Sequence, residues 1–181
     1  GTASGTFSAA EGDIYFPGNG DSRDFVAYYP HQAGMAGNGN KYAIDLSDQS
    51  SQKAIDLMRS AKVTGKNKNN ASVAFQFSHK LVKIEVTIEH GNGVATEDLA
   101  GTTVALTNQP VKGSFDVLTE GAEAEPEAVT EVNTLKSITL YPVPESSKYE
   151  AIVFPAETTE GMEMEFTVPA LGTCLLYTSD A

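Results

Sequence analysis

The strongest constraint on the fold is an alternation of apolar and polar residues with a period of two. Residues 82–89 read Val-Lys-Ile-Glu-Val-Thr-Ile-Glu, and residues 73–77 alternate in the same way. Successive side chains of a β-strand point to opposite faces, so both patterns predict strands with one buried face. Between them, residues 78–80 shift the phase, which predicts a bend, a bulge or a change of sheet.

Similar short runs recur along the chain between turn signals. The other expected strands are Ile14–Phe16, Asp24–Tyr29, Tyr42–Leu46, Thr102–Thr107, Ser114–Leu118, Ser137–Leu140, Tyr149–Phe154 and Glu163–Val168. Asn-Gly pairs at 19–20, 38–39 and 92–93 provide turn residues that tolerate a positive φ, and the first predicts a hairpin. A helix is expected only over Gln52–Lys62, with a strand at 55–57 as the alternative. Many short strands predict an all-β protein of antiparallel β-sandwiches.

Composition excludes several classes of function. The chain has 181 residues, 24 of them acidic and 12 basic, for a formal charge of −12. Such an acidic surface repels phosphate backbones, so we expect no nucleic-acid partner. Runs of ~18 apolar residues, as a membrane-spanning helix requires, are absent. The single cysteine, Cys174, leaves no pair for an internal disulfide.

The candidates for catalysis or metal binding are few. The three histidines, His31, His79 and His90, have no second ligand at a metal-binding spacing, and we interpret each as a turn or strand-end residue. No nucleophile elbow, phosphate-binding loop or dinucleotide-binding glycine pattern is present. The sequence therefore predicts no catalytic residue, metal site or cofactor, and a protein that is not an enzyme.

Aromatic residues gather near the start of the chain. They are Tyr15, Phe16, Phe25, Tyr28 and Tyr29. In alternating strands such residues are typical of a core, but an exposed set could stack on sugar rings. Tyr28 and Tyr29 are the candidate ligand contacts under that second interpretation.

Both ends of the chain have unusual features. The chain opens at Gly1 without a methionine or a signal sequence. Residues 174–181 resemble a translated transposase-type sequencing adapter, and we interpret them as a non-native tail. The alternative is a genuine apolar strand over Leu175–Tyr177.

The order of several motifs resembles the fimbrillin-like (Mfa-like) surface proteins of Bacteroidales. The segments that carry the resemblance are 14–17, 24–30, 42–50, 55–58, 99–101, 113–117 and 152–158. The most diagnostic is 75–84, which is close to the family's F-x-F-x-H-x-L-x-K-I. Its matching residues, which we interpret as structural, are Phe75, Phe77, His79, Leu81, Lys83 and Ile84.

The resemblance implies two tandem transthyretin-like β-sandwiches, both incomplete in this chain. The expected domains are a truncated N-terminal sandwich at 1–75 and a second sandwich at 76–173 that lacks its last strands. It also implies an outer-membrane-anchored lipoprotein of the cell surface that acts as a fimbrial (pilus) subunit or adhesin. Such subunits polymerise with other pilin subunits, identical or different, by donating a strand. The alternative is a surface glycan-binding module, with host or bacterial glycans or proteins as partners.

Overall fold

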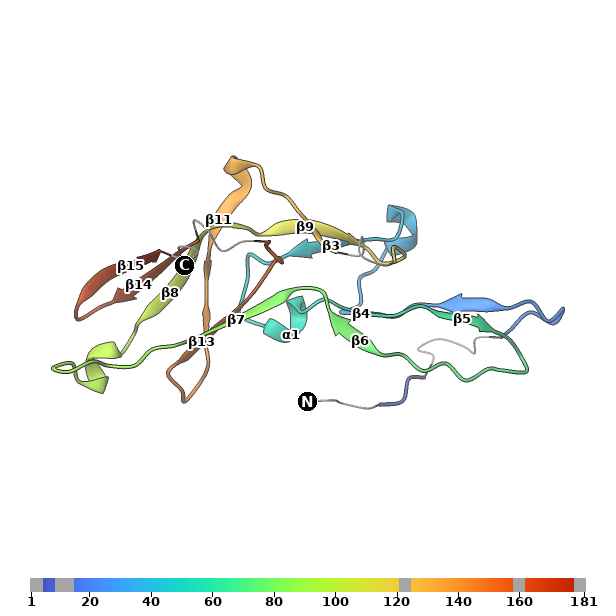
Figure 1. The fold of residues 1–181 in the computed structure, drawn as a ribbon, viewed down its shortest axis with the longest axis horizontal. Coiled ribbons are helices and arrows are strands. Elements are labelled where there is room, and N and C mark those ends of the chain that lie inside the picture. Colours follow the sequence, from blue (N-terminus) through green and yellow to red (C-terminus); the bar gives the residue numbers. More distant parts are fainter. Residues whose placement is uncertain (1–4, 9–14, 121–124, 158–161, 178–181) are drawn as a thin grey trace.

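The molecule is an elongated assembly of short strands (Figure 1). The computed structural model describes residues 5–8, 15–120, 125–157 and 162–177. Within these residues every pair of strands is antiparallel, and the predicted all-β class is confirmed. The helical segments are α1 (Gln52–Ile55), η1 (Met35–Asn38), η2 (Thr96–Leu99) and η4 (Val132–Thr134). None of the helices in these ranges has the length and apolar character needed to cross a membrane.

Two small sheets form an arm at one end of the molecule, on the right in Figure 1. The first pairs β1 (Arg23–Phe25) with β5 (Val63–Lys66). The second has the order β2 (Tyr28–Tyr29), β4 (Met58–Ser60), β6 (Phe77–His79). Among the described strands, β6 pairs with β4 alone, so it forms an edge of the arm.

Three further sheets make up the body. The first has the order β10 (Glu127–Ala128), β9 (Lys112–Asp116), β3 (Lys41–Asp45). The second has the order β12 (Tyr141–Pro142), β13 (Lys148–Val153), β7 (Val82–Thr87). The third has the order β11 (Leu135–Thr139), β8 (Thr103–Pro110), β14 (Glu163–Val168), β15 (Gly172–Tyr177).

Two apolar cores lie between these sheets. The first contains Met35, Tyr42, Ile44, Leu46, Leu57, Leu81, Phe115, Val117, Ile152 and Phe154. The second contains Val104, Leu106, Val111, Ile138, Leu140, Ala151 and Val153. Strand β13 contributes to both, because Ile152 faces the first core while Ala151 and Val153 face the second. The first core draws on residues before and after position 75, and the domain boundary at 75/76 stays a prediction.

The phase shift at residues 78–80 is a change of sheet. Strand β6 ends at His79 in the arm, and β7 begins at Val82 in the body. Leu81 between them is buried in the first core. The three Asn-Gly turns are also confirmed, since Gly20, Gly39 and Gly93 all have positive φ, at 88°, 61° and 86°.

The predicted helix over Gln52–Lys62 is wrong beyond its first turn. Helix α1 ends at Ile55, and Asp56 is already extended, with ψ at 90°. Leu57 then enters the first core, and β4 begins at Met58. Burial of Leu57 in the first core, and of Arg59 and Ser60 in the paired strand β4, overrides the weak helical spacing.

Two strand predictions and one hairpin prediction need correction near the start of the chain. Tyr15 and Phe16 are not in a strand, and Ile14 lies outside the described residues. The expected strand Asp24–Tyr29 is divided between β1 and β2, which join different sheets. The expected hairpin at 18–21 is only a turn, closed by a hydrogen bond from Gly20 N to Pro17 O of 3.2 Å, because β1 pairs with β5 instead.

At the C-terminal end, the backbone of Gly172–Tyr177 forms β15 against β14. This agrees with the strand alternative for residues 175–177. The interpretation of 174–181 as a non-native tail stays a prediction, and residues 178–181 lie outside the described part.

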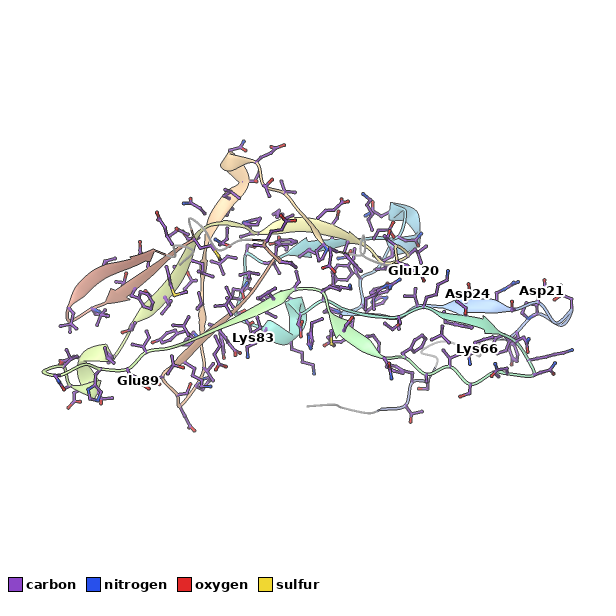
Figure 2. All side chains as sticks on the ribbon, viewed as in Figure 1. Asp21, Asp24, Lys66, Lys83, Glu89 and Glu120 are labelled. Carbon is purple, nitrogen blue, oxygen red and sulfur yellow. The ribbon has the colours of Figure 1, made fainter. Side chains whose placement is uncertain are left out.

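The ladder between β7 and β13 shows how this molecule neutralises like charges. Glu85 and Glu150 are direct cross-strand partners. Each has a lysine beside it: Lys148 Nζ lies 2.6 Å from Glu85 Oε1, and Lys83, seen near the middle of the molecule in Figure 2, pairs with Glu150. The hydrogen bond to Glu150 raises the pKa of Lys83, and the hydrogen bond from Lys148 lowers the pKa of Glu85. The repulsion expected between directly opposed like charges is thus compensated.

Candidate functional site

An apolar groove in the arm is the candidate functional site. It has a volume of about 620 Å³. Its lining is Gly5, Thr6, Phe7, Phe16, Phe25, Ala71, Val73, Ala74, Phe75 and Phe77. Five of these ten residues are phenylalanines, and none carries a charge, so the groove suits apolar side chains rather than a polar or ionic ligand.

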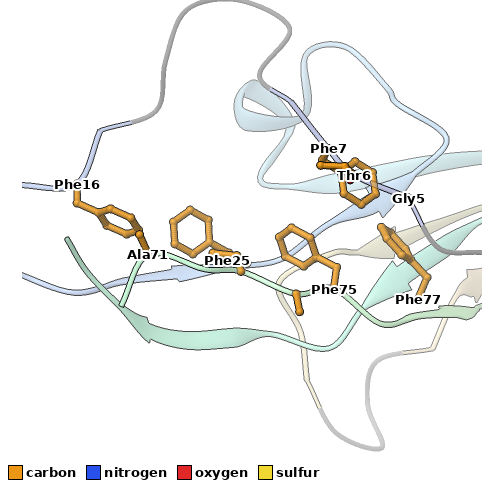
Figure 3. A pocket seen from close by; sticks show the side chains of 10 residues that line it. Gly5, Thr6, Phe7, Phe16, Phe25, Ala71, Phe75 and Phe77 are labelled. Atoms are coloured by element: carbon orange, nitrogen blue, oxygen red, sulfur yellow. The ribbon is translucent and has the colours of Figure 1, made fainter. Parts of the chain in front are cut away.

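The phenylalanines form a continuous row along the groove (Figure 3). Phe16 and Phe25 meet edge to face with ring centroids 6.0 Å apart, and Phe75 and Phe77 lie 6.4 Å apart. These four rings are half-buried and belong to neither core. They therefore present an aromatic surface that the body of the protein leaves partly uncovered.

The local sequence explains why these rings face the same way. Val73, Phe75 and Phe77 are half-buried while residues 74, 76 and 78 are exposed, which is the alternation that the sequence predicts. Phe25 reaches the groove because β1 pairs with β5, with Phe25 opposite Val63. The aromatic face is thus assembled from two segments about 50 residues apart in the chain.

The backbone beside the groove is open to pairing. The strand expected at residues 73–77 is wrong over 73–76, because residues 71–76 run in line with β6 but belong to no strand. Pairing begins only at Phe77, which lies opposite Ser60 of β4. Among the described strands, none pairs with the side of β6 that faces away from β4, and such an edge readily accepts another strand.

Phe7 lies over this edge. Its ring centroid is 6.2 Å from that of Phe75 and 6.1 Å from that of Phe77, yet 72% of Phe7 is exposed. Residues 5–8, which carry it, are not in a strand. Phe7 therefore covers part of the groove from the start of the chain while most of its own surface stays exposed.

The aromatic cluster expected from the sequence is divided. Phe16 and Phe25 line the groove, whereas Tyr15 is 82% exposed. Tyr28 packs against the first core, with its ring centroid 6.0 Å from that of Tyr42. Its hydroxyl donates a hydrogen bond to the backbone oxygen of Gln32 at 3.4 Å. Tyr29 is half-buried in β2. The role of Tyr28 and Tyr29 as ligand contacts stays a prediction.

The residues of the 75–84 motif lie in three places. Phe75 and Phe77 line the groove, Leu81 lies in the first core, and Ile84 packs against the second. His79 Nδ1 lies 2.8 Å from Asp56 Oδ1, which ties the end of β6 to the chain between α1 and β4. With the Lys83–Glu150 pair, every residue of the motif makes a contact within the chain.

Sequence reasoning did not single out Phe7. The signal was available, because Phe7 is an isolated aromatic residue in a segment of Gly, Thr, Ser and Ala. The residues around Phe7 show no alternation that would predict a partner for its ring. The other aromatic residues of the groove lie 9 to 70 positions further along the chain.

Metal-ligating side chains do not gather into a site in the part of the chain that the structure describes. No group of three or more His, Cys, Asp or Glu side chains is arranged there to hold a metal ion. The carboxylate of Asp45 instead accepts hydrogen bonds from Ser47 Oγ at 2.6 Å and Ser47 N at 3.0 Å, and Lys112 Nζ lies 3.3 Å away. Chiefly through the Ser47 hydroxyl, this arrangement lowers the pKa of Asp45.

We expect Asp45 to make folding stability pH-dependent in the acid range. A carboxyl whose pKa is lower in the folded state stabilises the fold above its unfolded pKa of about 4, and that contribution is lost as pH falls through the folded pKa. Because Asp45 is exposed, Asp45→Asn should cost only about 0.5–1 kcal/mol at pH 7 and nothing near pH 2. Urea denaturation of both proteins across this range measures the difference. An equal deficit at pH 2 and pH 7 would contradict the assignment.

Comparison with known proteins agrees with this architecture. The model of the fimbrillin-like family matches residues 1–181, so the chain belongs to the fimbrillin-like family, whose members are structural and adhesion proteins rather than enzymes. The proposed fimbrium subunit Fim1C of Bacteroides uniformis is 47% identical over 169 residues, which cover 92% of this chain and 53% of that protein.

Solved structures show the same fold. A proposed cell adhesion protein from Bacteroides uniformis matches with a TM-score of 0.84 and 45% identity, over 94% of this chain and 65% of the other. A proposed cell adhesion protein from Bacteroides ovatus matches with a TM-score of 0.67 and 26% identity, over 95% of this chain and 62% of the other. The chain thus spans about half the length of the curated relative and less than two thirds of each solved chain.

Proposed function

We propose that this protein is a fimbrial subunit or adhesin of the bacterial cell surface, held at the outer membrane and assembled with other pilin subunits. Membership of the fimbrillin-like family supports this role, as do relatives named as a fimbrium subunit and as cell adhesion proteins. The groove also supports assembly with other subunits, because an apolar groove beside a strand edge has the chemistry of a protein-binding site.

The subunits assemble by strand donation into this groove. A strand from a second subunit displaces residues 5–8 and runs along the edge made by 71–76 and β6. The observation that carries this proposal is the phenylalanine row at that edge, over which lies Phe7, a side chain that is itself 72% exposed. Alternate side chains of the incoming strand enter the groove and contact Phe25, Phe75 and Phe77.

Typical free energies of hydrogen bonding and apolar burial indicate that such a contact is stable. A strand that forms ~4–6 ladder hydrogen bonds gains a net ~0.5–1.5 kcal/mol from each. Two or three apolar side chains entering the groove add ~1.5–3 kcal/mol each. Association without a disulfide is therefore strong enough for slow dissociation, even after the cost of ordering the strand.

We expect Phe75→Glu to abolish assembly. A carboxylate in the middle of the row leaves a charge among aromatic rings, which opposes entry of an apolar strand. Phe75 is outside both cores, so the variant should keep its fold. Sedimentation velocity and negative-stain electron microscopy measure assembly, and circular dichroism with thermal denaturation verifies folding.

The matched control is Leu118→Glu, which introduces the same charge at an apolar residue that is 54% exposed and lies outside the groove. This control should assemble like the unmodified protein. Folded Phe75→Glu that assembles as well as the control would overturn strand donation at this groove.

A further inference from the structure

The chain contains three Asn-Gly pairs, and all six of their residues are exposed. The pairs are 19–20, 38–39 and 92–93. In such a pair the main-chain nitrogen of the glycine can attack the side-chain amide of the asparagine, because glycine has no Cβ to hinder the approach. The attack requires that the amide and the nitrogen are both free to move. The three pairs therefore differ in reactivity where the fold holds them differently.

Both reacting groups of the first pair are held by hydrogen bonds. Asn19 Nδ2 donates to Asp21 Oδ2 at 2.8 Å, and Asn19 Oδ1 accepts from Asp21 N at 3.1 Å. The nitrogen of Gly20 donates to Pro17 O at 3.2 Å. The side chain and the nitrogen must both leave these partners before they can meet, so the fold protects this pair.

The second pair is held in the same way at the end of η1. Asn38 Nδ2 donates to Lys41 O at 3.1 Å. The nitrogen of Gly39 donates to Met35 O and closes the last turn of the helix. This pair is therefore protected at both reacting groups as well.

The third pair lies in the turn between β7 and η2 and is held at neither group. The turn is closed by a hydrogen bond from Val94 N to Gly91 O of 3.2 Å, which uses no atom of the pair. Among the described residues, neither the Asn92 side chain nor the nitrogen of Gly93 has a hydrogen-bond partner. The amide and the nitrogen of this pair are thus free to approach each other.

We propose that Asn92 is a site of spontaneous modification, at which the asparagine converts to aspartate and isoaspartate. The nitrogen of Gly93 forms a bond to Cγ of Asn92, and the bond from Cγ to Nδ2 breaks. The proton of the Gly93 nitrogen leaves with Nδ2 as ammonia, and a cyclic succinimide remains. Water then opens the ring at either of its two carbonyl carbons, which gives the two products without any change of oxidation state.

The modification changes both the charge and the main chain of this turn. Residues 84–111 contain no lysine or arginine, so no cation of this segment offsets the new carboxylate. Isoaspartate also adds a carbon to the main chain between Gly91 and Val94, which disturbs the hydrogen bond that closes the turn. Amide hydrogen exchange at Val94 should therefore be faster in the modified protein.

The site is separate from the groove. Asn92 is not among the residues that line the groove, and the loop after β7 lies far from the arm in Figure 1. The inference thus goes beyond the proposed function and does not depend on strand donation.

Tryptic peptide mapping of the folded protein tests the inference. Trypsin cleaves after lysine and arginine, so the three pairs fall on the separate peptides 1–23, 24–41 and 84–112. The protein is kept at 37 °C in mildly alkaline buffer, which favours loss of the amide proton, and sampled over several weeks. Asn92 should convert at least about tenfold faster than Asn19 or Asn38, the factor expected when two hydrogen bonds must open first. Electron-transfer fragmentation locates the product at Asn92 and distinguishes isoaspartate from aspartate.

Two controls show whether the fold sets this order. In concentrated urea, where the hydrogen bonds are lost, the three pairs should convert at similar rates. In the folded Asp21→Ala variant, which removes the acceptor of Asn19 Nδ2, conversion of Asn19 should accelerate while that of Asn92 stays the same. Conversion of Asn19 or Asn38 as fast as that of Asn92 in the folded protein would overturn the inference. Protection of Asn92 in the folded protein but not in urea would overturn it as well.

Discussion

Phe115→Ala should lower the free energy of unfolding by about 3–5 kcal/mol, the range for removing a fully buried phenylalanine. Phe115 is 1% exposed in the first core, and its ring also lies 5.8 Å from Lys80 Nζ. The cavity that remains cannot collapse easily, because β9 is held on one side by β3 and on the other by β10. Urea denaturation followed by circular dichroism measures the loss.

Phe16→Ala is the matched control for Phe115→Ala. It removes the same atoms from a half-buried site outside both cores, so its cost should be well below that of Phe115→Ala. Equal losses for the two variants would show that the first core does not stabilise the protein as described.

Gly113→Ala should destabilise the protein by about 3 kcal/mol, at the upper end of the usual cost of overpacking. A Cβ atom at position 113 would lie 2.3 Å from Glu127 O and 2.6 Å from a ring carbon of Phe154. The carbonyl belongs to the paired strand β10, and the ring belongs to the first core, so neither can move without losing contacts. Differential scanning calorimetry should show the loss as a lower melting temperature.

Gly91→Ala serves as its control, since a Cβ atom there would meet nothing within 4 Å. It should leave the melting temperature unchanged or slightly raised. If Gly113→Ala melted at the same temperature as this control, β10 would not lie against β9 at the distance described.

The alternating strands could be predicted from the sequence because each pattern is local. Strand β7 and the sheet change after His79 follow from residues 73–89 alone. Strands β4 and β5 could not be found this way, since Arg59 and Ser60 are polar yet buried by their neighbours. Arg59 Nε donates to Val117 O at 3.0 Å, a partner 58 residues away that no local window contains.

The groove was predictable only in part. The alternation of Val73, Phe75 and Phe77 gives one wall. The other wall requires the pairing of β1 with β5, and the sequence favoured a local hairpin at 18–21 instead. Register between distant short strands is weakly specified by such patterns, which is why Phe25 and Phe7 could not be placed over Phe75 in advance.

The segment that occupies the groove in the assembled protein can be identified directly by cross-linking. A photoreactive phenylalanine analogue in place of Phe75, in an equal mixture of nitrogen-14 and nitrogen-15 labelled copies, identifies the segment in contact by mass spectrometry. Strand donation into the groove predicts cross-linked peptides that join one light and one heavy copy once assembly has occurred. Cross-links confined to residues 5–8 of the same copy, in fully assembled protein, would contradict it.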